Sequence, residues 1–85
     1  MTTKVVVYTK ESCPYCMMAK QLLASRNITF DEIRIDLDET KLDEMIRLSN
    51  RRTVPQIFIN DQPIGGYADL AELAKSGKLD GLINT

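Results

Sequence analysis

Histidine and tryptophan are both absent from this 85-residue sequence, and cysteine occurs only twice. A structural zinc site takes four ligands, mostly from cysteine and histidine, so one chain has too few of these residues to build such a site. The lack of histidine also leaves no base that titrates near neutrality without help from its surroundings. We therefore expect no metal cofactor, and any reactive group must be activated by its local environment.

Long apolar runs and an excess of positive charge are missing as well. No apolar run exceeds five residues, too few to cross a bilayer, and the opening Met1-Thr2-Thr3-Lys4 has no signal-peptide core. Eleven basic residues face twelve acidic ones, which gives nucleic-acid binding no electrostatic support. An apolar fraction of 44% and a charged fraction of 27% are typical of a globular domain, here a single one over residues 1–85. We expect a cytoplasmic monomer that binds neither membranes nor nucleic acids.

The two cysteines stand close together in Cys13-Pro14-Tyr15-Cys16. An apolar, β-branched run precedes them and a helical pattern follows, which is the arrangement of a thioredoxin-like redox site. Pro14 suits the first position of a helix, and Cys13, as the residue before a proline, is the expected N-cap. The unpaired N–H groups of the first turn would then favour an anionic sulfur at Cys13. Cys16, one turn further on, would keep a shielded, ordinary thiol.

The residues alone leave three roles open for this pair. Thiol–disulfide exchange is favoured, because a cysteine pair in a reducing compartment is more often redox-active than structural. A metal bridge between two chains and inert burial as small apolar side chains are the alternatives. A structural disulfide is disfavoured, since it would close a very small loop and stabilise the chain little.

Apolar periodicity predicts alternating strands and helices along the chain. Strands are expected at Lys4–Tyr8, Ile28–Ile35, Gln56–Ile59 and Pro63–Gly65. Helices are expected at Pro14–Arg26, after a cap at Asp38 or Thr40, and at Tyr67–Ser76, with a last short turn at Leu79–Ile83. The order β-α-β-α-β-β-α predicts an α/β domain in which a four-stranded mixed sheet lies between helices.

Details of three elements follow from the same patterns. Four apolar residues at helical spacing predict the buried face of the first helix: Met18, Ala19, Leu22 and Leu23. Four apolar side chains alternating with polar ones predict the second strand: Ile28, Phe30, Ile33 and Ile35. Asn27 and Gly77 are the expected stops of the first and third helices.

Three motifs make the sequence resemble the glutaredoxin family, in particular its small dithiol bacterial members. They are Cys13-Pro14-Tyr15-Cys16, Thr53-Val54-Pro55 and Gly65-Gly66-Tyr67-Ala68-Asp69. Their spacing, the order of elements and the total length match as well, whereas the Trp-Cys-Gly-Pro-Cys motif of thioredoxins is absent. The resemblance implies a thioredoxin-like fold and a glutathione-dependent thiol–disulfide oxidoreductase.

The resemblance also implies how glutathione is held. Pro55 would be cis, and the backbone of Val54 would pair with the central cysteine of glutathione while its sulfur bonds Cys13. The γ-glutamyl carboxylate would lie on the amides of Tyr67 and Ala68. The full set of implied contact residues is Lys10, Tyr15, Arg52, Thr53, Val54, Pro55, Gly66, Tyr67, Ala68 and Asp69.

Individual roles within this set follow from charge. Asp69 would lie near the ammonium of glutathione, and Lys10, with Arg51 or Arg52, would meet the glycyl carboxylate. Tyr15 would flank the sulfur. Many family members have Asp or Ser where this chain has Ala68, which removes a polar contact to the γ-glutamyl group.

The implied reaction is disulfide exchange in cell redox homeostasis. Cys13 alone would serve glutathionylated proteins, and Cys13 with Cys16 would reduce protein disulfides; ribonucleotide reductase is a partner that the family suggests. Two alternatives are an electron donor fed by thioredoxin reductase and an iron–sulfur carrier in which two chains each donate Cys13. Pro14 argues against the carrier. The charges of Asp69 and Lys10 favour glutathione over thioredoxin reductase.

Overall fold

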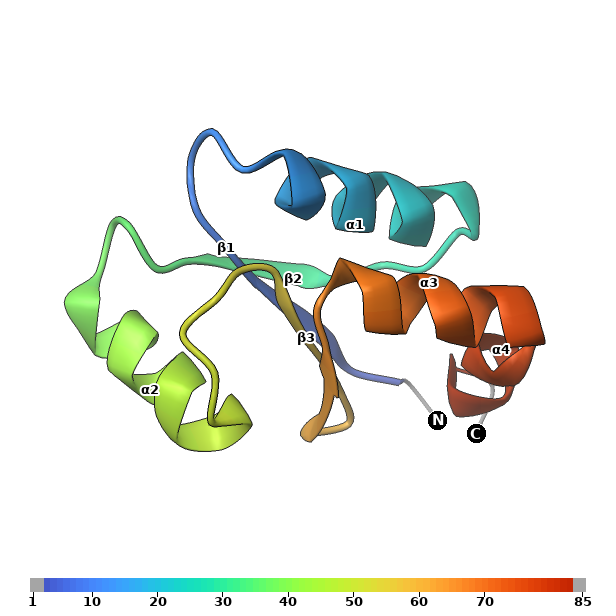
Figure 1. Cartoon of the computed structure of the whole chain (residues 1–85). Helices are drawn as coiled ribbons and strands as arrows, with labels where there is room; N and C mark the ends of the chain where they lie inside the picture. Colours follow the sequence, from blue (N-terminus) through green and yellow to red (C-terminus); the bar gives the residue numbers. More distant parts are fainter. Residues whose placement is uncertain (1–2, 84–85) are drawn as a thin grey trace.

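Four strands form one mixed sheet in the order β2-β1-β3-β4 (Figure 1). The computed structural model describes residues 3–83. Its elements are β1 (Val5–Thr9), α1 (Pro14–Ser25), β2 (Asp31–Arg34), α2 (Glu39–Ser49), β3 (Gln56–Ile59), β4 (Gln62–Gly65), α3 (Tyr67–Ser76) and α4 (Lys78–Ile83). The predicted α/β architecture and order of elements are confirmed, and the short last helix follows α3 as expected.

The strand directions bring three chain segments to one edge of the sheet. β1 runs parallel to β2 and antiparallel to β3, and β3 runs antiparallel to β4. Tyr8 near the end of β1 pairs with Gln56 at the start of β3, and Ile57 pairs with Gly65 at the end of β4. The start of α1, the loop before β3 and the start of α3 therefore meet at this edge.

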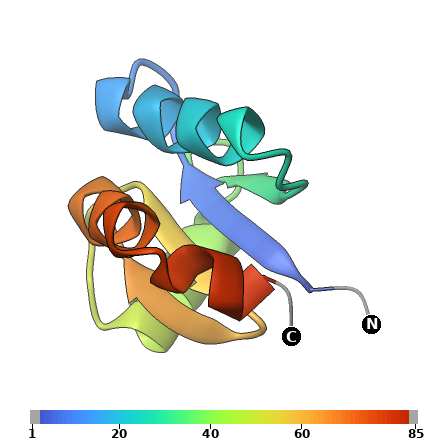
Figure 2. The same ribbon diagram turned by 90° about the vertical axis from the view of Figure 1, so that its right-hand side faces the viewer.

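The helices cover the two faces of the sheet unequally, with α1, α3 and α4 on one face and α2 on the other (Figures 1 and 2). The larger core cluster consists of Val5, Val7, Ala19, Leu23, Ile28, Ile57, Ile59, Leu70, Ala74 and Leu79. The smaller cluster under α2 is built on Tyr8, Met45 and Phe58. Both follow from the strands' alternation, since Val5 and Val7 face one way and Val6 and Tyr8 the other.

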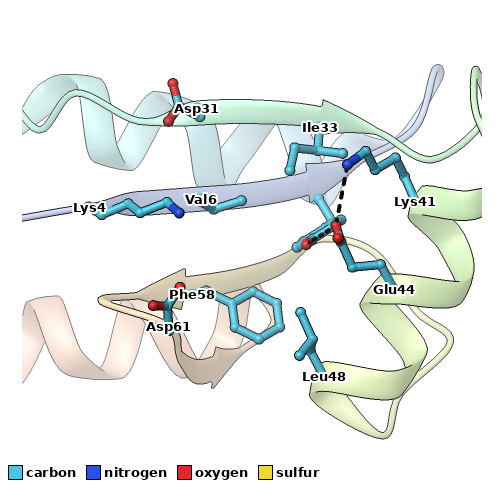
Figure 3. A pocket seen from close by; sticks show the side chains of 10 residues that line it. Lys4, Val6, Asp31, Ile33, Lys41, Glu44, Leu48, Phe58 and Asp61 are labelled. Carbon is cyan, nitrogen blue, oxygen red and sulfur yellow. Dashed lines mark hydrogen bonds and ion pairs between the residues drawn. The ribbon is translucent and has the colours of Figure 1, made fainter.

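A hydrogen bond joins α2 to the sheet beside the apolar side chains of the smaller cluster (Figure 3). The Tyr8 hydroxyl donates a hydrogen bond to Glu44 Oε2 (2.7 Å), and Lys41 Nζ lies 3.7 Å from the same oxygen. Burial and this bond to Glu44 raise the pKa of Tyr8 to about 12, so the hydroxyl remains a donor at neutral pH. A cavity of about 440 Å³ remains between α2 and the sheet. Since neither cysteine lines it, this cavity lies apart from the thiol pair.

The second strand is shorter than expected, and its apolar residues do not share a face. Ile28 and Phe30 precede β2 and pack on the α1 side, whereas Ile33 and Ile35 pack on the α2 side. Residues an odd number of positions apart point to opposite faces of a strand, so these four could not line one face. Ile28 instead belongs to the end of α1, where its N–H bonds to Leu23 O (3.0 Å).

The predicted buried face of α1 was wrong at one residue. Met18 is 40% exposed, whereas Cys16, Ala19 and Leu23 form the buried line. These three residues lie at the spacing i, i+3 and i+7, which places Met18 to the side of that line.

The expected helix ends are confirmed. Asn27 follows α1 with φ 59° and Gly77 ends α3 with φ 81°, both in the left-handed region. Asp38, one of the two candidates, caps α2 by accepting a hydrogen bond from Thr40 N (2.9 Å). The β3–β4 turn consists of Asn60 and Asp61, whose positive φ values of 50° and 69° match a two-residue hairpin turn.

The placement of the core predicts a contrast between two leucines. Replacing the fully buried Leu70 by alanine should lower the free energy of unfolding by about 2–5 kcal/mol, because burial is lost and a cavity is left. Leu48→Ala, at a helical position that is 49% exposed, should change it by only about 0.5 kcal/mol. Urea denaturation followed by circular dichroism measures both, and similar losses in the two variants would contradict this core.

Candidate active site

Cys13 sits at the N-terminus of α1 and caps it through its sulfur. Its backbone is extended, with φ −114° and ψ 101°, and the Cys16 N–H donates a hydrogen bond to Cys13 Sγ (3.2 Å). The helix dipole and the unpaired amides of the first turn favour negative charge at this point. The predicted N-cap is confirmed, and the sulfur occupies a place that suits a thiolate.

Cys16 lies one turn inside α1 and is chemically different from Cys13. It is 1% exposed, against 7% for Cys13, and both cysteines are free. Burial, followed by the hydrogen bond with Cys13, raises the pKa of Cys16 to about 11. At neutral pH Cys16 is therefore a thiol, as the sequence predicted, and a less acidic one than an ordinary cysteine.

The loop before β3 lies directly against Cys13. Val54 O is 3.8 Å from Cys13 Sγ, close enough to accept a weak hydrogen bond from the thiol. The Val54–Pro55 peptide bond is cis, which confirms that expectation from the resemblance. The segment Thr53–Val54 thus lies beside Cys13 and lines two clefts.

The first cleft, called here the Cys13 cleft, has a volume of about 500 Å³. Its lining consists of Lys10, Ser12, Cys13, Pro14, Ile35, Leu42, Arg52, Thr53 and Val54. The charged members of this lining, Lys10 and Arg52, are both basic. The surroundings of Cys13 therefore favour an anionic substrate, although the whole chain carries a net charge of −1.

The second cleft, called here the α3 cleft, has a volume of about 330 Å³. Its lining consists of Tyr15, Arg51, Thr53, Val54, Pro55, Gly66, Tyr67, Ala68 and Asp69. Gly66 is the N-cap of α3, and the first intrahelical bond runs from Leu70 N to Gly66 O (3.1 Å). The amides of Tyr67 and Ala68, in the turn before that bond, have no carbonyl partner within the helix. They form a ready anion site at one end of the cleft.

Asp69 has a structural task at the same helix start. Its Oδ2 accepts a hydrogen bond from Gly66 N (3.0 Å) and lies 3.4 Å from Arg51 Nη1. Gly65 has φ 117°, and a Cβ there would overlap the Asp69 carboxylate. Glycine at position 65 therefore makes room for Asp69 as well as for the turn. A Cβ at Gly66 would meet only ordinary contact, 3.5 Å from Pro55 O.

All ten residues expected to contact glutathione line one cleft or the other. Tyr15 lies on the α3 cleft, 61% exposed, with its ring 6.2 Å from that of Tyr67. Sequence reasoning left Arg51 and Arg52 undecided; the structure separates them, with Arg51 on the α3 cleft and Arg52 on the Cys13 cleft. Ser12, with φ 57°, lines the Cys13 cleft and had no signal in the sequence.

Comparisons with known proteins assign the chain to a family. A family model described as glutaredoxin matches residues 5–64. The chain belongs to the glutaredoxin family. It is 53% identical over 79 residues to glutaredoxin 3 of Escherichia coli, which covers 93% of this chain and 95% of that relative.

Two solved glutaredoxins show the same fold. The solution structure of glutaredoxin from Brucella melitensis has a TM-score of 0.85 and 43% identity, covering 96% of this chain and 89% of the other. A buckwheat glutaredoxin–glutathione complex has a TM-score of 0.88 and 27% identity, covering 96% and 77%. The glutaredoxin chain described here therefore has the thioredoxin-like fold of the thiol–disulfide oxidoreductases to which its family belongs.

Residues 3–83 contain neither a metal-binding cluster nor a membrane-spanning helix. No cluster of three or more histidine, cysteine, aspartate or glutamate side chains in this range is arranged to hold a metal ion. None of its helices combines the length and apolar character that crossing a membrane requires.

The difference between the two thiols predicts unequal alkylation. At pH 7.5 iodoacetamide should modify the Cys16→Ser variant, which keeps Cys13, at least about tenfold faster than the Cys13→Ser variant, because burial shields Cys16 and is the largest cause of its raised pKa even when Cys13 is replaced. Mass spectrometry follows both reactions. In Cys13→Ser the rate should rise steadily as the pH approaches 10. Equal rates in the two variants would contradict the assigned roles.

Proposed function

We propose that this glutaredoxin uses glutathione to reduce disulfides, with Cys13 alone acting on glutathione mixed disulfides and Cys13 with Cys16 acting on protein disulfides. One observation carries the proposal: Cys13 Sγ caps α1 and opens into a cleft whose charged side chains, Lys10 and Arg52, are both basic. Glutathione presents two carboxylates around one cysteine, and a second anion site lies at the start of α3. The family's use of glutathione and the buckwheat complex support the same ligand.

The monothiol reaction needs only Cys13. Its thiolate attacks the glutathione sulfur of a mixed disulfide, so a Cys13–glutathione disulfide forms and the substrate leaves as a thiolate that takes up a proton. A second glutathione thiolate then attacks the glutathione sulfur bound to Cys13. Oxidised glutathione leaves, and the Cys13 thiolate is regenerated at the helix N-terminus. The chain contains no histidine that could act as a base, and the first-turn amides of α1 face the attacking sulfur instead.

Binding of glutathione in this pose spans both clefts. The backbone of Val54 pairs with the central cysteine, and the glycyl carboxylate lies toward Lys10 and Arg52 in the Cys13 cleft. The γ-glutamyl carboxylate lies on the amides of Tyr67 and Ala68 in the α3 cleft.

Acidic and aromatic groups complete the α3 cleft. Asp69 uses Oδ2 to cap α3, which leaves Oδ1 for the ammonium of glutathione. Arg51, paired with Asp69 at 3.4 Å, reduces the negative charge that the ammonium meets. Ala68 offers a backbone amide without a polar side chain, and Tyr15 also lines the cleft.

The dithiol reaction uses the difference between the thiols. Cys13 attacks a protein disulfide, releases one target thiolate and remains joined to the other target sulfur. Cys16 then attacks Cys13 Sγ, and the second target thiolate leaves and takes the proton of Cys16. Once Cys13 is in a disulfide, the hydrogen bond and the charge at Cys13 that help to raise the pKa of Cys16 are gone. The pKa of Cys16 is therefore lower after the first step than before it, although burial, the largest cause of its rise, remains.

The choice of electron donor is the first experiment. Reduction of the mixed disulfide of glutathione and cysteine should proceed with NADPH, glutathione and glutathione reductase, and should fail when thioredoxin reductase replaces the last two. NADPH absorbance at 340 nm measures both. Turnover with thioredoxin reductase alone would contradict the proposed use of glutathione and would identify thioredoxin reductase as the electron donor. A brown protein with visible absorbance would indicate the iron–sulfur carrier.

The two cysteine variants separate the two routes. Cys13→Ser should lose all turnover, because the nucleophile is removed. Cys16→Ser should still reduce glutathione mixed disulfides but lose most reduction of a protein disulfide. The same coupled assay, with one small and one protein substrate, measures the split, and joint loss in Cys16→Ser would rule out the monothiol route.

A further inference from the structure

A buried amide at the start of β3 stands out among the core residues. Gln56 is only 1% exposed, and with Thr9 it makes up the buried polar side chains of residues 3–83. Burying a primary amide is costly unless its hydrogen bonds are made. The partners of Gln56 therefore show what this burial achieves.

Both donor bonds of the Gln56 side chain go to a single residue in the loop before β3. Nε2 donates to Thr53 O (3.0 Å) and lies within hydrogen-bond distance of Thr53 Oγ1 (3.2 Å). Thr53 itself is exposed. Pro55, between the two residues, has no N–H to donate. The Gln56 side chain thus fixes the exposed Thr53, three residues before it, from a buried position at the start of β3.

Fixing the Thr53 carbonyl also fixes the N–H of Val54, because both belong to one planar peptide unit. The Thr53–Val54 bond is trans, since the cis bond of this loop is the next one. In a trans peptide the C=O and N–H point in opposite directions. With Thr53 O held toward the buried Gln56 amide, the Val54 N–H points away from it.

Val54 joins this peptide unit to the next one, whose carbonyl lies beside Cys13. Its carbonyl is 3.8 Å from Cys13 Sγ, and Thr53 and Val54 line both clefts. A substrate backbone that pairs with Val54 gains more affinity when the donor is already oriented, because ordering it on binding costs free energy.

We propose that Gln56 is a positioning residue for disulfide exchange. The side-chain amide of Gln56 orients the N–H of Val54, so that the backbone of the substrate's cysteine pairs with Val54 while the sulfur of that cysteine meets Cys13. This role rests on the proposed pairing of glutathione with Val54. Gln56 touches neither the substrate nor the reacting sulfur, so its effect depends on whether the substrate carries a peptide backbone.

The test compares two disulfides in single-step reactions. In a Cys16→Ser background, attack by Cys13 on oxidised glutathione or on cystamine stops at a mixed disulfide that mass spectrometry counts. Cystamine has no peptide groups to pair with Val54. Gln56→Met keeps the length of the side chain but removes the donors, and Gln62→Met, at an exposed position on β4, is the matched control.

Gln56→Met should lower the second-order rate constant for oxidised glutathione about tenfold, the effect of losing one well-placed hydrogen bond, and change that for cystamine less than about twofold. Gln62→Met should change neither. Equal losses with both disulfides, or no loss with oxidised glutathione, would overturn the proposal. If Gln56→Met does not fold by circular dichroism, Gln56→Asn, whose amide is too short to reach Thr53, replaces it under the same criterion.

The rates of the protein that keeps Gln56, measured with the same two disulfides, distinguish a failure of this inference from a failure of the proposed function. If it reacts no faster with oxidised glutathione than with cystamine, the glutathione site and the role of Gln56 both fail. If it prefers oxidised glutathione and Gln56→Met keeps that preference, only the role of Gln56 fails.

Discussion

The hydrogen bond from the Cys16 N–H to Cys13 Sγ is the contact on which the site depends. It makes the first cysteine the cap of α1, so the same turn that begins the helix also supplies donors to the sulfur. Pro14 enforces this arrangement from both sides, because it favours an extended backbone before it and a helical one from its own position onward. The helix buries Cys16 as it exposes the Cys13 sulfur to the cleft. One local geometry therefore produces two unlike thiols from two identical residues.

The sheet determines what the Cys13 sulfur meets. Because β3 is antiparallel to both β1 and β4, its beginning lies beside their ends, and the loop before β3 faces the start of α1. The start of α3 follows β4 at the same edge. The N-terminus of α1 and the loop before β3 thus line the Cys13 cleft, and the same loop and the start of α3 line the α3 cleft. The charged side chains that line the Cys13 cleft, Lys10 and Arg52, are both basic although the chain as a whole carries a net charge of −1.

The sequence predicted the features that depend on short-range preferences. Its predictions were wrong or missing where packing between distant segments determines the structure. The Cys13 cap, the Asn27 and Gly77 stops and the order of elements follow from short-range preferences, so they could be inferred. The exposure of Met18 depends on which side of α1 meets the sheet, and the short β2 depends on how Ile28 leaves the helix. Arg51 and Arg52 are identical neighbours in the sequence, and only the course of the loop sends them to different clefts. Gln56 had little signal, since it is one polar residue at the start of an otherwise apolar strand.

In the α3 cleft a single acidic residue, Asp69, has both a structural role and a proposed binding role. Asp69 must cap Gly66 to hold the start of α3, and the proposed ligand needs a negative charge at the same place. A carboxylate meets both because it has two oxygens, and the missing side chain of Gly65 leaves space for it. A residue larger than glycine at position 65 would displace Asp69 and so disturb the helix start and the anion site together. Gly65 and Asp69 thus form one structural unit, in which the missing side chain of Gly65 allows the Asp69 carboxylate to reach the start of α3.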